Sequence, residues 1–310
     1  MAFALNGYRQ ALSARDGASY RRPVDNKTEI REFLSTRRAR VTPEQVGLPT
    51  FGGNRRVKGL RREEVALLAG VSVDYYVRLE RGNLGGVSEG VLEAISRALQ
   101  LDDVERMHLF DLSRTANASI GTRRRAVTTT IRSSVQRMLD SFSGPAWVRN
   151  DRMDILGANV MARALYAPVF ADPARRPNTA RFTFLDAGAP DFYVDWSDVT
   201  HDSVAILRAA AGRNPYDKAL SDLIGELSTR SELFRQAWAS HDVGMHRSGV
   251  KRMRHPEVGD LELTYEAMEL VMDPGLTVLT YSAEPASPSE EKLRLLAVWA
   301  ATEALAEPSV

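Results

Sequence analysis

The segment 61–82 carries two short apolar stripes at helical spacing. The first stripe stops at Gly70, a residue suited to the left-handed position that ends a helix. Ser72 then offers a side-chain acceptor to the first amides of a second helix, whose stripe is Tyr76 and Leu79. Two short helices joined by a three-residue turn that contains Gly are typical of a helix-turn-helix. Such a motif places the N-terminal residues of its second helix in a DNA major groove.

Similar stripes predict three more helices around this pair. Thr28 caps the first, Ser88 caps the second, and Asp102 with Asp103 begins the third. A capping box that starts at Thr42 predicts one helical turn in between. The three helices are expected at about 28–40, 89–100 and 103–113. With the central pair they make a complete all-α domain, preceded by a disordered extension over 1–27 and followed by a linker over 114–130.

The charge of this domain favours DNA. The segment 37–62 carries eight Arg or Lys residues and one acid, Glu44. A solvated face usually interleaves its signs, so such a run favours phosphate contact. The chain as a whole has a formal net charge of only +1, so the basic run is local. The basic loop 48–58 is long for a compact domain, and we interpret it as a DNA-contacting arm rather than an idle loop.

The central segment also resembles a known family. Its strings Gly59-Leu60-Arg61-Arg62-Glu63-Glu64-Val65-Ala66, Ala69-Gly70-Val71-Ser72, Tyr75-Tyr76 and Leu79-Glu80-Arg81-Gly82 resemble the Cro/repressor-type (XRE) helix-turn-helix, and more narrowly the MmyB-like branch of regulators. The resemblance implies that base edges are read by Ser72, Val73, Asp74, Tyr75 and Arg78. Arg62 stands where the broader family usually has Gln. The basic residues expected at phosphates are Arg37, Arg38, Arg55, Arg56, Lys58, Arg61 and Arg62.

From about residue 131 the pattern changes. A helical stripe over 131–139 is followed by a predicted hairpin over 146–158 and by several helices up to about residue 240. Apolar residues then alternate with polar ones over 261–266, as in a half-buried strand. With flanking strands near 245–254 and 276–281 this predicts an antiparallel meander with one packed and one wet face. A last helix follows Ser287. The expected fold class is α+β, with the second domain over 131–310.

This second domain is similar to the PAS-like ligand-binding domain of the MmyB-like family. The similarity is carried by Trp147-Val148, residues 154–159, Asp195-Trp196, Leu207-Arg208, Arg213-Asn214-Pro215, residues 234–238, His255-Pro256 and residues 258–261. It implies a pocket between sheet and helices for a small apolar or amphipathic ligand of the fatty-acid kind. The aromatic residues that would line this pocket are Trp147, Phe182, Phe192, Trp196, Trp238 and Tyr265. From the residues alone, each of them is more often part of a plain core, and only the family resemblance favours the pocket.

Other chemistry has little support. The chain has no Cys, which excludes disulfides, thiolate zinc sites and cysteine nucleophiles. His241, His246 and His255 lie near Asp242, but their spacing does not match a zinc site, and His255 is expected to stabilise a turn. Phosphate-loop, dinucleotide and nucleophile-elbow motifs are absent from the sequence, and no apolar stretch is long enough to span a bilayer. We therefore expect no cofactor and no enzymatic activity.

The predicted function is that of a cytoplasmic, ligand-responsive transcription regulator. It would bind double-stranded operator DNA as a homodimer and have no membrane partner. Two alternatives stay open at this point. One is a ligand-binding protein or enzyme with a non-regulatory DNA-binding head, and the other is a nonspecific architectural DNA binder.

Overall fold

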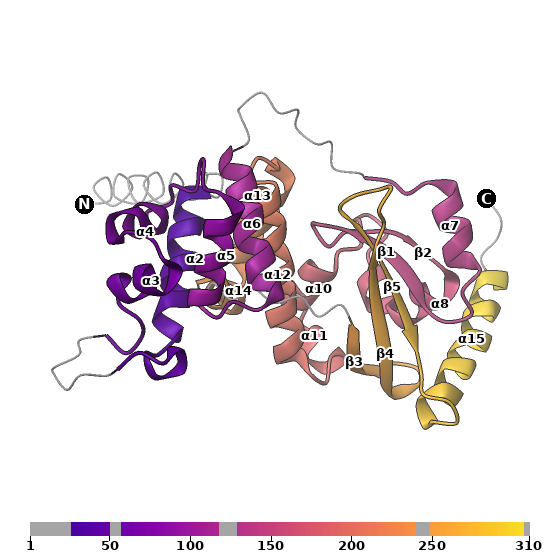
Figure 1. Cartoon of the computed structure of the whole chain (residues 1–310). Helices are drawn as coiled ribbons and strands as arrows, with labels where there is room; N and C mark the ends of the chain where they lie inside the picture. Colours follow the sequence, from indigo (N-terminus) through magenta and orange to yellow (C-terminus); the bar gives the residue numbers. More distant parts are fainter. Residues whose placement is uncertain (1–25, 50–56, 118–128, 240–247, 307–310) are drawn as a thin grey trace, which may run out of the picture. The chain divides into compact units, whose positions relative to one another are not determined.

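The computed structural model describes residues 26–49, 57–117, 129–239 and 248–306 (Figure 1). Its contacts divide the chain into two compact units. The helical unit consists of residues 1–120 with 211–229, and the sheet unit consists of residues 121–210 with 230–310. The sequence places the division in a single linker over 114–130, whereas the contacts also assign residues 211–229 to the helical unit.

The helical unit contains the five predicted helices and the predicted turn. They are α2 (Asn26–Arg40), η1 (Glu44–Val46), α3 (Arg62–Ala69), α4 (Val73–Glu80), α5 (Glu89–Ala98) and α6 (Asp103–Asn117), and α13 (Lys218–Arg230) accompanies them. The last turn of α6 extends beyond residue 113, where the loss of apolar periodicity predicts linker. Helix boundaries are the part of a pattern-based prediction that varies most, because the ends of helices depend on caps rather than on the stripe.

The caps that the sequence predicts around the central pair are present. Gly70 ends α3 with a φ of +66°. The Ser72 hydroxyl accepts a hydrogen bond from the Tyr75 amide at 3.2 Å, and the Ser88 hydroxyl accepts one from the Val91 amide at 3.4 Å. These bonds satisfy amides that have no partner inside their own helix. The turn between α3 and α4 therefore consists of the three residues 70–72, as a helix-turn-helix requires.

The sheet unit contains one five-stranded sheet among its described residues. Its strands are β1 (Ala146–Asn150), β2 (Ile155–Ala158), β3 (Ser248–His255), β4 (Gly259–Glu269) and β5 (Leu276–Ser282). The order is β2-β1-β5-β4-β3, and all neighbours are antiparallel. The predicted hairpin and meander are both confirmed. Sequence periodicity did not show how they join, which is through the pairing of β1 with β5, where Trp147 lies opposite Leu279.

Eight helices of the described chain belong wholly or mainly to this unit. They are α7 (Ser133–Asp140), α8 (Val160–Leu165), α9 (Ala167–Phe170), α10 (Thr179–Leu185), α11 (Ala189–Phe192), α12 (Trp196–Arg213), α14 (Glu232–Ala239) and α15 (Pro288–Ala306), with the last residue of α13. The short helices α9 and α11 were not predicted. Each is a single turn with Pro at its start, too short for a periodic stripe to reveal it.

The two faces of the sheet are covered differently along its width. One face carries the main core, in which Leu261, Leu263 and Tyr281 pack with residues of α8, α11 and α15. On the other face, Val148 and Val278 pack with α7. The expected pattern of one packed and one wet face therefore describes β4, whose inward residues alternate with exposed ones, but β1 is buried throughout. The reason is that α7 covers its second face.

The outer edge of β3 is also occupied. The amide of Val194 donates a hydrogen bond to the carbonyl of Arg252 at 3.1 Å, and Tyr193 forms an isolated bridge with Met253. The Arg252 guanidinium is also paired with the carboxylate of Asp195. The segment that follows α11 thus lies along β3 and covers its outer edge in the position that a sixth strand would take.

Candidate functional site

The first candidate site is the exposed start of α4. Ser72, Val73 and Asp74 are exposed, with 45% of Val73 accessible. One turn later the Arg78 guanidinium lies over the Tyr75 ring, 4.9 Å from its centroid. A cation above an aromatic face is attracted to it, and the contact limits the conformations of a long side chain. The five residues predicted to face base edges therefore share one accessible surface of the helix.

The opposite face of α4 holds a buried carboxylate. Glu80 is 2% exposed, and its Oε1 accepts hydrogen bonds from Arg38 Nε and Nη2 at 2.9 and 2.8 Å. Its Oε2 accepts a hydrogen bond from Arg62 Nε, and this bond raises the pKa of Arg62. One carboxylate thus joins α2, α3 and α4. The burial of Glu80 could have been predicted from the sequence, because Glu80 follows the buried Tyr76 by four residues and so lies on the same helical face.

A second buried carboxylate holds Arg37. Arg37 is 2% exposed and its Nε lies 2.7 Å from Glu105 Oε1. The guanidinium also lies over the Phe33 ring at 5.1 Å. Arg40 approaches the same carboxylate at 3.2 Å but stays largely exposed. The charge pattern predicts Arg37 and Arg38 at phosphates, whereas in the structure both are engaged in ion pairs that hold helices together.

The other basic residues are distributed as follows. Lys58 and Arg61 are exposed beside the start of α3, and Arg62 keeps 55% of its side chain accessible despite its bond to Glu80. Arg55 and Arg56 lie outside the described residues. A one-sided run of charge in the sequence therefore contains two kinds of arginine, and only burial separates those that pair internally from those that face solvent.

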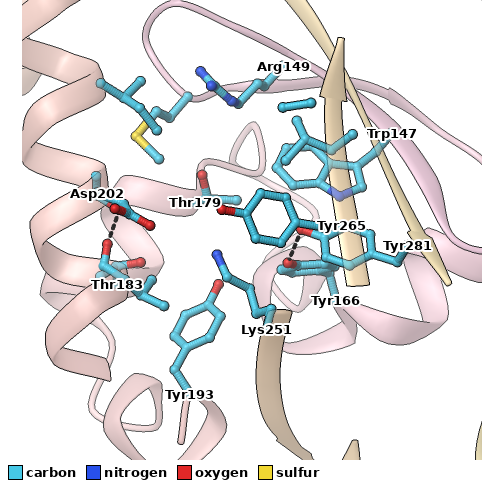
Figure 2. Close-up of a pocket in the computed structure, with 16 residues that line it drawn as sticks. Trp147, Arg149, Tyr166, Thr179, Thr183, Tyr193, Asp202, Lys251, Tyr265 and Tyr281 are labelled. Carbon is cyan, nitrogen blue, oxygen red and sulfur yellow. Dashed lines mark hydrogen bonds between the residues drawn. The ribbon is translucent and has the colours of Figure 1, made fainter. Parts of the chain in front are cut away.

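The second candidate site is a cavity inside the sheet unit, shown in Figure 2. It lies between the sheet and helices α10 and α12. Space for water-sized molecules amounts to about 60 Å³. Its aromatic wall is formed by Trp147, Tyr166, Tyr193, Tyr265 and Tyr281. Its main polar groups come from Arg149, Thr179, Thr183, Asp202, Ser203 and Lys251.

The polar residues of the cavity are positioned by caps and strand register. Asn178 accepts a hydrogen bond from the Arg181 amide at 2.8 Å and so caps α10, which begins at Thr179. The Asn178 side chain also donates to Asp154 Oδ1 at 2.8 Å, which ties this cap to the β1–β2 hairpin. On β3, Lys251 stands on the same face as the buried Met253, because the two residues are two apart in a strand.

Lys251 has an unusual environment for a lysine. Its Nζ lies 5.2 Å from the centroid of the Tyr265 ring and 5.9 Å from that of Tyr193. The residue as a whole is half-buried, but desolvation of its ammonium end lowers the pKa of Lys251, and Arg149 lowers it too, whereas Asp202 raises it. Among the described residues no carboxylate is in ion-pair contact with this ammonium. The two tyrosine rings and the charge of Asp202 compensate in part for this desolvation.

The tyrosines are neutral hydroxyl donors and acceptors. Tyr166 and Tyr281 share a buried hydrogen bond of 2.6 Å between their hydroxyls (Figure 2). Burial raises the pKa of Tyr265 to about 12, and burial likewise raises the pKa of Tyr166 and Tyr281. Each phenol therefore keeps its proton near neutral pH, and the wall of the cavity carries no phenolate charge.

Some buried polar atoms of the cavity are not satisfied. Thr179 is 5% exposed, and its hydroxyl has no hydrogen-bond partner in the described structure. Thr183 Oγ1 and Trp147 Nε1 also lack a hydrogen bond of good geometry. Thr183 lies close to Tyr193 and Trp147 lies close to Tyr281, and each offsets part of the rise in pKa that burial causes in its tyrosine. Native proteins leave few such groups, so three around one cavity indicate a site for a polar guest or water.

Comparison with known families identifies both units. Residues 131–296 match the family described as MmyB-like transcription regulator ligand binding domain, and residues 29–109 match a family described as Helix-turn-helix domain. The first match covers more than half of the chain. The chain belongs to the MmyB-like transcription regulators. It is a DNA-binding regulator with a ligand-sensing domain. A search of curated proteins returns no significant match.

The aromatic residues predicted for the ligand site of this MmyB-like regulator are divided by the structure. Trp147 and Tyr265 line the cavity. Phe182 and Phe192 contact each other edge to face at 5.5 Å in the adjoining core. Trp196 donates its indole N–H to the Thr183 carbonyl at 3.2 Å. Trp238 lies under the Arg208 guanidinium, 4.4 Å from it. The last four are not among the lining residues.

The remaining sequence expectations concern metal and membrane. His255 Nδ1 accepts a hydrogen bond from the Glu257 amide at 3.2 Å, which confirms its role in the turn, and its Nε2 lies 3.0 Å from the Ala164 carbonyl. His241, Asp242 and His246 lie outside the described residues. Within the described part of this MmyB-like regulator, no group of three or more metal-ligating side chains gathers. No helix there has the length and apolarity to cross a bilayer.

Proposed function

We propose that this protein binds operator DNA as a homodimer through α4, and that a small amphipathic ligand in the cavity of the sheet unit changes that binding. The observation that carries the DNA half is the accessible start of α4, where Arg78 is held against Tyr75. Arg is the residue best suited to bidentate contact with guanine, and Val73 and Tyr75 present apolar surface for a thymine methyl group.

The phosphate contacts are assigned from exposure. We assign them to Lys58, Arg61 and Arg62, and retain Arg55 and Arg56 as candidates. Arg37 and Arg38 are left out because Glu105 and Glu80 already neutralise them. The homodimer is inferred from the geometry of helix-turn-helix proteins, whose two-fold symmetry matches paired half-sites about 34–36 Å apart. Ligand-dependent coupling of about 1–3 kcal/mol would be typical of such regulators.

The test is binding of the purified protein to DNA from its own promoter region and to scrambled DNA of equal length, across roughly 50–200 mM salt. We expect a preference of about a thousandfold or more for the promoter DNA. Arg78→Ala should remove about 1–3 kcal/mol of that preference, because it deletes a base contact. Arg61→Ala should weaken binding to both DNAs equally, because phosphate carries no sequence information.

Arg97→Ala provides a matched control. Arg97 is an exposed arginine on α5, outside the proposed surface, and its removal should leave the preference unchanged. Equal, salt-sensitive affinity for both DNAs would contradict sequence-specific regulation and leave the architectural alternative. Absence of binding to either DNA would leave the ligand-binding alternative.

A further inference from the structure

The cavity of the sheet unit limits the ligand first by size. Its free space of about 60 Å³ corresponds to roughly four to six water molecules, if each water requires about 10–15 Å³ of such space. That number of waters occupies about 120–180 Å³ as liquid. A single-ring molecule fits this volume, whereas a long-chain fatty acid requires much more. The size of the cavity therefore favours a single-ring ligand over a long-chain fatty acid, whereas the family resemblance alone does not distinguish between them.

Charge limits the ligand next. Two cations, Arg149 and Lys251, face the cavity together with one carboxylate, Asp202. Figure 2 shows Lys251 and Asp202 approaching the same space from different elements, β3 and α12. The ammonium is stabilised only partly, by the faces of Tyr193 and Tyr265 and by the charge of Asp202. A guest with one negative charge would give the Lys251 ammonium the ion-pair partner that it lacks among the described residues, which a neutral guest would not do.

The aromatic walls of the cavity and the unpaired Thr179 hydroxyl limit the ligand in a third way. Five aromatic rings line the space, and ring-on-ring contact favours a flat aromatic guest over an aliphatic one of equal size. The Thr179 hydroxyl, which lacks a partner, is a donor for an acceptor oxygen on that guest. A bare inorganic anion would satisfy the charge but would leave the aromatic walls without contact.

We propose that the ligand of this regulator is a small aromatic carboxylic acid with a single ring, bound as its monoanion with the carboxylate at Lys251. The inference rests on the proposed role of the cavity as the ligand site, and it replaces the fatty-acid-like ligand that resemblance implies with a smaller and more polar class. Thr179 completes the anion site, while Trp147 and Tyr265 contact the ring.

The test uses the full chain and four probes: benzoate, benzamide, acetate and myristate. Binding is followed by calorimetry and by Trp fluorescence, because Trp147 lines the cavity. We expect benzoate to bind at least about tenfold more tightly than benzamide, which has the same ring without the charge, and at least about tenfold more tightly than acetate, which has the charge without the ring. This comparison needs no variant and therefore does not depend on the folding of one.

A pair of lysine variants then assigns the carboxylate. Lys251→Met should abolish the preference for benzoate over benzamide. Lys292→Met is the matched control, since Lys292 is a partly exposed lysine on α15, outside the cavity lining, that donates to the Asp260 carbonyl at 2.6 Å, and it should keep the preference. Equal binding of benzoate and benzamide would overturn the proposal, and so would binding of myristate without benzoate.

Promoter-DNA binding, measured on the same protein samples, separates this proposal from the proposed function. Benzoate binding that leaves DNA affinity unchanged would uphold the ligand class and contradict ligand-dependent regulation by that ligand. Sequence-specific DNA binding that responds to myristate and not to benzoate would uphold the regulator and overturn the ligand class. The two failures therefore give different results.

Discussion

The two units treat buried charge in opposite ways. In the helical unit, the buried carboxylates of Glu80 and Glu105 are each approached by two arginines. In the sheet unit, Lys251 faces a cavity without an ion-pair partner among the described residues, and the Thr179 hydroxyl is unsatisfied. A polar group that is fully paired inside a domain holds the fold together, whereas one that is left unpaired beside a cavity is available to a guest. The presence or absence of an ion-pair partner thus distinguishes Glu80 and Glu105 from Lys251.

The largest effect that follows from this comparison is expected at Glu80. Glu80→Gln removes the charge that Arg38 and Arg62 share, which leaves uncompensated cations near the core. Breaking a buried ion pair costs about 3–5 kcal/mol, and the cost here should lie near the lower end because Arg62 is still half exposed. The free energy of unfolding of the helical unit, followed by hydrogen exchange at α3 and α4, measures this change.

The matched control is Glu63→Gln on the exposed side of α3. Glu63 pairs only loosely with Arg61, at 3.5 Å between exposed side chains, so its loss should change stability by no more than about 0.5 kcal/mol. A similarly small loss for Glu80→Gln would mean that the buried network contributes little to the unit.

An intermediate effect is expected at the tyrosine pair of the sheet unit. Tyr166→Phe leaves the Tyr281 hydroxyl buried without its 2.6 Å partner, and an orphaned hydroxyl costs about 1–3 kcal/mol. The double variant with Tyr281→Phe should lose less than the sum of the two single changes, because no hydroxyl is then left unpaired. Thermal unfolding of the four proteins gives the coupling, and additive losses would show that the pair is not a unit.

The smallest effect on stability, and of opposite sign, is expected at Thr179. Thr179→Val removes a hydroxyl that already lacks a partner, so stability should stay unchanged or rise by up to about 1 kcal/mol, while benzoate binding weakens. Thr200→Val is the matched control, since the equally buried Thr200 donates to the Ser197 carbonyl at 2.7 Å. It should lose about 0.5–1.5 kcal/mol. Equal losses of unfolding free energy in Thr179→Val and Thr200→Val would contradict the comparison between the two units.

The pH dependence of ligand binding sharpens the same contrast. Desolvation lowers the pKa of Lys251 below its usual 10.5, so the ammonium loses its proton at a lower pH than a free lysine does. Benzoate affinity should therefore fall as the pH rises from neutrality toward 10.5, before ordinary lysines titrate. Asp202, Arg149, Tyr193 and Tyr265 surround this group, and none of the tyrosines ionises in the lower part of that range. In Lys251→Met, the benzoate affinity measured by calorimetry should not change with pH in the lower part of that range.

The lowered pKa of Lys251 also makes the stability of the fold depend on pH. Between the lowered folded pKa and 10.5, the unfolded chain binds more protons at Lys251 than the folded chain does. The contribution of this residue to folding therefore becomes more favourable as the pH rises through that window. Unfolding free energies of the unmodified protein and of Lys251→Met should converge with rising pH, and a constant difference would contradict the desolvated ammonium.

The sequence predicted much of the helical unit because its signals are local. Gly70, Ser72 and Ser88 act through neighbours within a few residues, so their roles could be read without the fold. The ion pair of Arg37 with Glu105 could not be read, because it joins residues far apart in the chain. Burial of Arg37 became visible only when the helices were placed in space.

The cavity was less predictable for a related reason. In the segment around Lys251, the apolar Val250 and Met253 are three apart, so sequence alternation does not tell which residues face inward. The structure exposes Val250 and turns Lys251 inward with Met253. Trp147 and Tyr265, which line the cavity, were predicted from the family resemblance. Thr179, Asp202 and Lys251 were missed because polar residues attract notice as ligand groups only when their neighbours are known.

The segment that lies along the outer edge of β3 has a consequence for behaviour at high concentration. An uncovered terminal strand offers its amides and carbonyls to a strand of another molecule, which is a common start of aggregation. Here Val194 already bonds the Arg252 carbonyl, and Asp195 pairs with the side chain of the same residue. Breaking this cover, for example with Asp195→Ala, should promote edge-to-edge self-association detectable by light scattering, even in a protein whose fold and DNA surface are intact.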